Sequence, residues 1–370
     1  MAQFATGDAV ARFWCRDMNR SISLLTLFLL VSLGSLWALD LYLENIKRQQ
    51  RLHDSTFRLL AQGTAISLEQ VGRVVLSLRD SDKTWTFRRG EPGWRLPEYH
   101  DAFALGPELD GILKAVLEGR GTIVGRSPED SRHFGVTSRD TMKLALFDRE
   151  DASLMRVWVG LIAPGQRARE CYTTVEGRAS IYHMNSNAWG PLKWTPESSF
   201  PPLLDRRVIP GALKRRFVAR ITFGGTQAPL LREIVRKDLP MDPKLFDRGP
   251  RFEWYGTLES GSKKRLADAD TLSYVNFMRN LVFDGLVGNR SSLSREFQDP
   301  VLTVILEYDG NVKDVLELGA GKSRDRDYLS NATTGQVFLI SAEKAVALTP
   351  DCEALLKEPA RPATSPAPRK

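Results

Sequence analysis

The longest run of apolar residues lies near the start of the chain, between residues 22 and 43, and contains one charged residue, Asp40. As a helix rising about 1.5 Å per residue, a segment of this length spans roughly 30 Å of hydrocarbon. We therefore predict a short N-terminal tail over 1–20 and a transmembrane helix over 21–43. The predicted anchor positions carry apolar or interfacial side chains and comprise Ile22, Leu25, Leu29, Leu33, Trp37 and Tyr42.

A cleavable signal peptide is the competing interpretation of this run. The apolar core of a signal peptide has about 7 to 15 residues and is followed by small residues. A cut after Ala38 places Leu36 at the third position back, where a small residue is required. An uncleaved anchor is therefore favoured. Basic residues lie on both sides of it, so the positive-inside rule gives no orientation.

The pattern after the anchor changes from helical to mixed. Residues 44–69 are polar with intermittent apolar positions and good helix formers, which predicts a stalk helix. Two short runs rich in Val, Leu, Trp and Phe within 71–96 predict a β-hairpin. The spacing of one helical face then appears at Leu109, Ile112, Leu113, Val116 and Leu117. Strand-like alternation follows at Met142, Leu144 and Leu146.

The second half of the chain repeats this order of elements. The corresponding positions lie 156 to 160 residues apart and are Trp94 and Trp254, Met142 and Leu302, Leu144 and Val304, Leu146 and Leu306, Val159 and Leu318, Gly160 and Gly319, Tyr172 and Tyr328, Ile181 and Val337, and Tyr182 and Phe338. A spacing that drifts by so few residues indicates an internal duplication. Because the aromatic residues recur in both copies, we expect them to serve the core rather than a binding site.

We therefore predict an α+β fold, in which two tandem repeats of β-hairpin, helix and antiparallel β-meander follow the transmembrane helix and stalk. The predicted boundaries are 70–197 for the first repeat, 198–217 for a basic connector, 218–350 for the second repeat and 351–370 for a disordered tail rich in Pro and Ala. A segment rich in Pro and Asp, "KDLPMDPKLFDRGP", predicts a surface insertion in the second repeat.

The charge of the chain is mildly basic, with a formal net charge of +7. This excess comes without a recognition motif, so we expect no nucleic-acid partner. The densest basic cluster lies in the connector and comprises Arg206, Arg207, Lys214, Arg215 and Arg216. It is interpreted first as a solvated connector, and alternatively as a contact for acidic lipid headgroups or an acidic partner.

Motifs for enzyme chemistry are missing from the sequence. It contains no phosphate-binding loop, dinucleotide fingerprint, nucleophile elbow or H-E-x-x-H motif. The four histidines are scattered, and the three cysteines fit no metal or redox spacing. We therefore expect no catalytic residues, no cofactor and no metal. A disulfide between Cys171 and Cys352 stays open at this point, since it depends on the compartment and on the distance between them.

The glycine-rich stretch "VWVGLIAPGQRARECYTTVEGRASIY" at first resembles a phosphate loop or a redox site. Its counterpart in the second half is "VLELGAGKSRDRDYLSNATTGQVFLI", in which Asp327 stands where Cys171 stands. The two copies are explained as strands joined by turns that contain glycine. The cysteine is not part of the shared pattern.

Several segments together resemble a known bacterial family. They are "WRLPEY", "ELDGILKAVLEG", "SRHFGV", "VWVG" and "CYTTVEGRASIY", and they resemble the domain of unknown function 4340 family. The second copy departs from the pattern because "FQDP", which contains Phe297, lacks the glycine that follows Phe134. The resemblance implies an N-terminal membrane anchor, an extracytoplasmic body and an auxiliary role beside ABC transporters of the gliding-motility type.

These observations favour a non-enzymatic module of the bacterial inner membrane. We expect a single-pass protein with a cytoplasmic N-terminus and a periplasmic or otherwise extracytoplasmic body. Its expected partners are the lipid bilayer and a membrane protein such as an ABC transporter permease. A structural or scaffold subunit of another membrane complex is the alternative, and an extracytoplasmic ligand-binding protein or enzyme using a groove between the copies is a third hypothesis.

Overall fold

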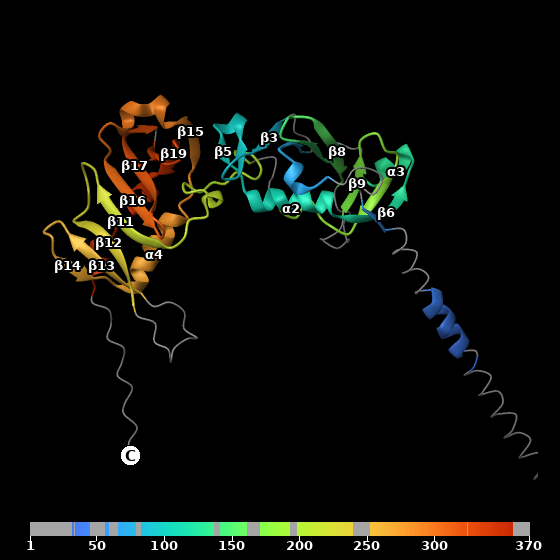
Figure 1. The fold of residues 1–370 in the computed structure, drawn as a ribbon, viewed down its shortest axis with the longest axis horizontal. Coiled ribbons are helices and arrows are strands. Elements are labelled where there is room, and N and C mark those ends of the chain that lie inside the picture. Colours follow the sequence, from blue (N-terminus) through green and yellow to red (C-terminus); the bar gives the residue numbers. More distant parts are fainter. Residues whose placement is uncertain are drawn as a thin grey trace, which may run out of the picture.

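The computed structural model of the protein describes residues 32, 34–44, 56–58, 66–78, 83–136, 141–160, 171–192, 198–239, 252–323 and 325–357. It contains two antiparallel sheets with few helices, which confirms the α+β class. Figure 1 shows the sheets as two lobes that lie side by side along the longest axis, with the connector between them. We call them the first lobe (β1 to β10) and the second lobe (β11 to β19).

The first lobe is built on a sheet of ten strands. In chain order they are β1 (Thr56–Arg58), β2 (Arg73–Ser77), β3 (Thr84–Arg89), β4 (Trp94–Leu96), β5 (Ala102–Phe103), β6 (Arg120–Gly125), β7 (Met142–Phe147), β8 (Ser153–Val159), β9 (Cys171–Val175) and β10 (Ile181–Met184).

The second lobe is built on a sheet of nine strands. In chain order they are β11 (Val218–Gly224), β12 (Leu231–Asp238), β13 (Phe252–Leu258), β14 (Lys263–Arg265), β15 (Gly285–Asn289), β16 (Leu302–Tyr308), β17 (Val312–Ser323), β18 (Arg326–Asn331) and β19 (Gln336–Ser341).

Short helices connect and cover these strands. The α-helices of the body are α2 (Gly106–Leu117), α3 (Pro128–His133), α4 (Asp268–Arg279), α5 (Ala342–Ala347) and α6 (Cys352–Leu356). The 3-10 helices are η1 (Leu68–Gln70), η2 (Pro97–Tyr99), η3 (Gly211–Leu213) and η5 (Arg290–Phe297). Before the body, residues 34–44 are helical.

The two sheets have the same strand order, which matches the repeat in the sequence. The first sheet runs β6-β10-β9-β8-β7-β2-β3-β4-β5, and the second, read from its β15 edge, runs β15-β19-β18-β17-β16-β11-β12-β13-β14. Each helix that follows the fourth strand of this set, α2 or α4, stands at the equivalent point of the chain. The first sheet has one further strand, β1, which pairs with β6.

The apolar pattern of the sequence accounts for these elements. The predicted face of α2 is buried at all five positions, and in β7 the alternating residues Met142, Leu144 and Leu146 are buried. Trp94 and Trp254 are each only 2% exposed, so the prediction of a shared core role is confirmed for this pair. A single hydrophobic cluster includes residues of both lobes.

The paired glycines of the repeat mark the same close approach in both lobes. A Cβ atom on Gly160 would lie 2.8 Å from the carbonyl oxygen of Phe134, and one on Gly319 would lie 3.0 Å from that of Glu296. The segments that these glycines contact, α3 and η5, therefore occupy equivalent places. Phe297, next to Glu296, is buried beside Gly319 although the glycine that follows Phe134 has no counterpart there.

The connector runs between the lobes and forms backbone hydrogen bonds with both of them. We call this junction the seam. On the first lobe, Leu105 N–H donates to the Leu203 carbonyl over 2.7 Å and Asp205 N–H donates to the Phe103 carbonyl over 2.9 Å. A few residues later the chain pairs with the second lobe: Val208 N–H donates to the Leu281 carbonyl over 2.8 Å, and Phe283 N–H donates to the Arg206 carbonyl over 3.0 Å. The interpretation of a solvated connector is therefore wrong for residues 202–205 and 208–210, which are buried, whereas Arg206, Lys214 and Arg216 are exposed.

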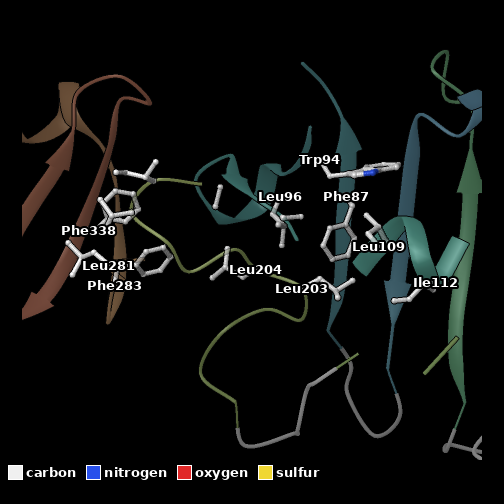
Figure 2. Close-up of a cluster of buried hydrophobic side chains, with 14 of the residues drawn as sticks. Phe87, Trp94, Leu96, Leu109, Ile112, Leu203, Leu204, Leu281, Phe283 and Phe338 are labelled. Carbon is white, nitrogen blue, oxygen red and sulfur yellow. The ribbon is translucent and has the colours of Figure 1, made fainter. Parts of the chain in front are cut away.

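Apolar side chains fill this seam, as Figure 2 shows. Leu203 lies beside Phe87 of the first lobe, and Leu204 lies between Leu96 and the aromatic pair of the second lobe. That pair, Phe283 and Phe338, is stacked with ring centroids 4.8 Å apart. Since Leu203, Leu204 and the two rings are buried, the junction between the lobes is packed like a core.

In each lobe, the segment that precedes the sheet pairs at the equivalent place, as the strand β1 in the first lobe and as an isolated bridge in the second. In the first lobe Phe57 pairs with Gly121 and Arg58 with Arg120, at the start of β6. In the second lobe Arg207 pairs with Val282, just before β15. The predicted stalk helix over 44–69 is therefore wrong over 56–58, because long-range pairing overrides the helix-forming local sequence there. Leu68 and Glu69 instead begin the short 3-10 helix η1. The rest of that prediction beyond residue 44 falls mostly outside the described residues.

The end of the second lobe also differs from the prediction of a disordered tail beginning at residue 351. Residues Cys352–Leu356 form α6, and the Asp351 side chain caps this helix through the N–H groups of Glu353 and Ala354. Leu355 is buried, and its carbonyl accepts a hydrogen bond from Ala267 N–H over 2.9 Å. Residues 358–370 lie outside the described residues, as do residues 240–250 of the predicted insertion at 237–250 and residues 161–170 of the glycine-rich stretch.

The cysteines of the body do not pair. Cys171 in β9 and Cys352 in α6 are free thiols in different lobes, so the hypothesis of a bridge between them is wrong. The Cys171 thiol donates to the Ser186 carbonyl over 3.1 Å. Burial raises the pKa of this thiol, which favours its protonated form.

Candidate functional site

A groove of about 980 Å³ lies on the first lobe, beside the connector. Its walls come from the β3–β4 turn, the start of α2, the β7–β8 turn and the connector around η3. Three clusters of arginine and carboxylate side chains line it. The groove is therefore polar and contains both signs of charge.

The first cluster centres on Asp151 in the β7–β8 turn. Its carboxylate accepts from Arg73 Nε over 2.6 Å and from Arg88 Nη2 over 3.2 Å. Asp151 has a positive φ of 66°, which the tight turn requires. The hydrogen bond from Arg73, with the charges of both arginines, lowers the pKa of Asp151. Arg73 also lies over the Phe147 ring, 3.7 Å from its centroid.

The second cluster joins α2 to the strands beneath it. Asp110 accepts from Trp94 Nε1 over 3.0 Å and from Arg89 Nη2 over 3.3 Å at the same oxygen. The Arg89 guanidinium lies over the Trp94 ring at 4.4 Å and also donates to the Val71 and Leu68 carbonyls. Because these contacts fix the guanidinium on several sides, Arg89 forms a rigid part of the groove wall.

The third cluster holds the connector. Asp205 is buried, and its two oxygens accept from Arg207 Nε and Nη2, each over 2.8 Å. The Gly211 N–H also donates to this carboxylate over 2.8 Å. The hydrogen bonds from Arg207 to Asp205 raise the pKa of the guanidinium. A Cβ atom on Gly211 would collide with the Arg207 side chain, so the close turn favours glycine here.

The groove can recognise a polar chain by hydrogen bonds and charge. Its arginines are paired with carboxylates, and paired guanidinium groups still present N–H donors toward the hollow. Across the ranges that the structure describes, no group of three or more His, Cys, Asp or Glu side chains is placed to hold a metal ion. The groove therefore offers hydrogen-bond donors, acceptors and charges of both signs to a bound chain.

The structure places the predicted contact residues of the connector in different surroundings. Arg207 and Lys214 line the groove. Arg206 instead lies over the Phe200 ring and donates to the Phe283 carbonyl. Arg215 is paired with the fully buried Asp314, so the prediction that it contacts a partner is wrong. Arg216 is exposed and stays a predicted contact.

The predicted anchor residues are described only in part. Trp37 and Tyr42 lie in the helical residues 34–44 and are 70% and 64% exposed. Four anchor residues fall outside the described residues, namely Ile22, Leu25, Leu29 and Leu33. Among the helices that the structure describes, none is both long enough and apolar enough to cross a membrane.

Sequence reasoning missed most of the groove. Its first two clusters come from side chains far apart along the chain, and no motif links Asp110 or Asp151 to their arginines. The useful signal was the pair Arg88 and Arg89 at the end of β3, just before a turn. Adjacent residues in a strand point to opposite faces, which suggests two different partners but does not name them.

Comparisons with known proteins add no identity. No family model, curated protein or solved structure matches the chain.

Proposed function

We propose that the protein is a non-enzymatic, membrane-anchored extracytoplasmic module that assists another membrane complex. The helical residues 34–44 carry this proposal. All of them are exposed, including the large apolar or interfacial side chains Leu36, Trp37, Leu39, Leu41, Tyr42 and Leu43. A helix with apolar side chains on every side and no protein cover is stable when lipid surrounds it.

The body supports a binding role for the part outside the membrane. Its two lobes are joined by a packed seam, and the groove on the first lobe presents paired charges from three regions of the fold. A rigid surface of this kind loses little conformational freedom when a partner binds. We propose the groove as the surface that contacts the partner complex.

The partner is proposed from the family resemblance. The segments that resemble the domain of unknown function 4340 family imply an ABC transporter of the gliding-motility type. In this arrangement the N-terminus is cytoplasmic, the helix crosses the inner membrane once and the body is periplasmic. The protein then acts as an auxiliary subunit beside the permease.

Membrane anchoring can be tested by fractionation of cells that express the full chain. Arginine near the centre of a membrane helix costs about 2.5–3.5 kcal/mol. The double variant Leu33→Arg and Leu36→Arg should therefore move from the membrane to the soluble fraction. Leu230→Arg, at a position 66% exposed on the second lobe, is the matched control and should stay in the membrane. Equal distribution of both variants would count against the anchor.

The partner can be tested by purification of the tagged full chain from mild detergent. We expect a permease and its ATPase among the recovered proteins. Arg88→Glu in the groove should reduce the recovery of these proteins, because it reverses the charge of a side chain that is 55% exposed there. Arg156→Glu in β8 is the control, since Arg156 forms an exposed ion pair with Glu176. Recovery of the chain without any membrane protein would overturn the proposal.

A scaffold subunit of another membrane complex is the second candidate. The seam favours it, since a two-lobed body without an internal hinge can hold a fixed distance between neighbours. Crosslinks confined to residues 44–69 and 205–220 would favour this role, and crosslinks at groove residues outside these ranges, such as Arg88 and Asp151, would favour the first. A ligand site between the lobes is not proposed, because Leu203, Leu204 and Phe283 fill the junction.

A further inference from the structure

We infer that the outer edge of β14 is a docking surface for an extended, acidic segment of a partner protein. β14 is the last strand on its side of the second sheet, and among the described residues no strand pairs with its outer edge. Its residues Lys263, Lys264 and Arg265 are all exposed. The inference rests on three observations: the backbone register, the equivalent edge of the first lobe and the charge.

The register shows which backbone groups point outward. Leu266 N–H donates to the Trp254 carbonyl, and Leu258 N–H donates to the Ser262 carbonyl. Between these two contacts, Lys264 pairs with Gly256. Because hydrogen-bonding direction alternates along a strand, the backbone groups of Lys263 and Arg265 point away from β13. They are free to form a ladder with an added strand.

The equivalent edge of the first lobe already binds an added segment. There Ala104 N–H donates to the Trp94 carbonyl over 2.9 Å, as Leu266 does to Trp254 over 2.9 Å in the second lobe. Outside this contact, the Phe103 carbonyl accepts from Asp205 N–H, and Ala104 bridges to Leu204 in antiparallel pairing. The fold therefore accommodates an extended segment at this edge.

The second lobe forms one equivalent contact of this kind with its own chain. Ala267 N–H donates to the Leu355 carbonyl, as Leu105 N–H does to Leu203. The next equivalent acceptor is the Arg265 carbonyl, which stands where Phe103 stands in the first lobe. No hydrogen bond to this carbonyl occurs within the described part of the chain. The ladder can thus be continued by another polypeptide.

The charge of the edge selects the partner. Arg265 is paired with Glu253 and Asp268, whereas Lys263 and Lys264 form no ion pair with the described residues. A second copy of this edge would bring like charges together, which disfavours self-association. A segment with acidic side chains gains favourable pairs across the strands. Backbone bonding gives affinity and the lysines give specificity, as in other cases of strand addition.

The test is binding of a synthetic probe to the full chain in detergent. The probe is a fluorescent eight-residue peptide of alternating Thr and Glu, and a peptide of the same charge with Pro in place of Thr is its control. Fluorescence anisotropy should show binding of the Thr peptide and at least tenfold weaker binding of the Pro peptide. Equal affinities would overturn strand pairing, and no binding of either would overturn the docking surface.

Variants of β14 separate charge from backbone pairing. Lys263→Glu with Lys264→Glu should weaken binding at least tenfold, and so should Lys263→Pro, which removes an outward N–H without touching the β13 ladder. Arg126→Glu with Arg132→Glu, at exposed positions on the first lobe, changes the charge equally and should leave binding intact. Circular dichroism melting confirms that each variant is folded. Unchanged affinity in either β14 variant would contradict the inference.

Discussion

Arg215 and Asp314 form a two-point ion pair inside the second lobe, although they are separated by 99 positions in the chain. Arg215 Nε lies 2.7 Å from one carboxylate oxygen and Nη2 lies 2.8 Å from the other. Asp314 is fully buried, and its hydrogen bonds raise the pKa of the Arg215 guanidinium. The pair fastens the end of the connector to β17.

Loss of this pair should destabilise the protein strongly. In Asp314→Asn the guanidinium of Arg215, only 15% exposed, keeps its charge without a counterion. Removal of one partner of a buried pair costs about 3–5 kcal/mol. Urea unfolding should show this loss, while Lys313→Gln, on the exposed neighbour, should change stability by less than about 1 kcal/mol. A loss below about 1 kcal/mol in Asp314→Asn would show that the pair does not stabilise the fold.

The seam predicts that the two lobes unfold together. Phe283→Ala removes a ring that stacks on Phe338 and is only 1% exposed. We expect a loss of about 3–5 kcal/mol. Differential scanning calorimetry should show one transition for the wild type and two for the variant, because the weakened junction no longer couples the lobes. Leu230→Ala, at an exposed site, should shift stability by no more than about 0.5 kcal/mol. Two transitions in the wild type would contradict this picture.

The lowered pKa of Asp284, just before β15, predicts that the stability of the protein depends on pH. Burial alone would raise its pKa, but hydrogen bonds from the Lys344 ammonium and the Ser341 N–H, with nearby positive charge, outweigh it and lower the pKa. A carboxyl group with a lowered folded pKa adds stability above its unfolded pKa of about 3.9, and this stability disappears as the pH falls through the folded value.

Asp284→Asn should therefore be less stable than the wild type at pH 7, and the difference should narrow below about pH 4. Urea unfolding at a series of pH values measures it. Asp299→Asn, on an exposed loop, is the control and should follow the wild type throughout. A difference that stays constant down to the acid range would mean that ionisation of Asp284 is not the cause.

The close approach at Gly160 predicts a marked cost for a single methyl group. In Gly160→Ala the new Cβ atom would lie 2.8 Å from the Phe134 carbonyl oxygen, so the segment after α3 must move. Overpacking of this kind costs about 1–3 kcal/mol. Gly224→Ala is the matched control, since its nearest neighbour would be 3.8 Å away. Equal melting temperatures for the two variants would show that the close approach at Gly160 tolerates a methyl group.

The fold could be predicted from the sequence where packing repeats at fixed spacing. Trp94 and Trp254 lie on equivalent strands, and so do Met142 and Leu302 on β7 and β16. Both pairs are buried, because the repeat preserves the residues that face the core. The spacing of apolar residues along the chain predicts helices and strands from local sequence alone, and the two copies show this spacing independently.

The errors arose where distant pairing decided the structure. The basic composition of the connector suggested a solvated segment, yet Asp205 and Asp314 neutralise Arg207 and Arg215 inside the protein. Likewise, residues 56–58 form an edge strand because β6 offers them a ladder. Neither partner is visible in the local sequence, and the groove was missed for the same reason.

The pairing of the connector has a mechanical consequence. Asp205 belongs to the ladder of the first lobe and Arg206 to that of the second, so consecutive residues are fixed to different bodies. No unpaired residue lies between Asp205 and Arg206 to act as a hinge. A rotation of one lobe must therefore move the other lobe with it. We expect the body to tumble as a single elongated particle, with one rotational correlation time for labels on either lobe.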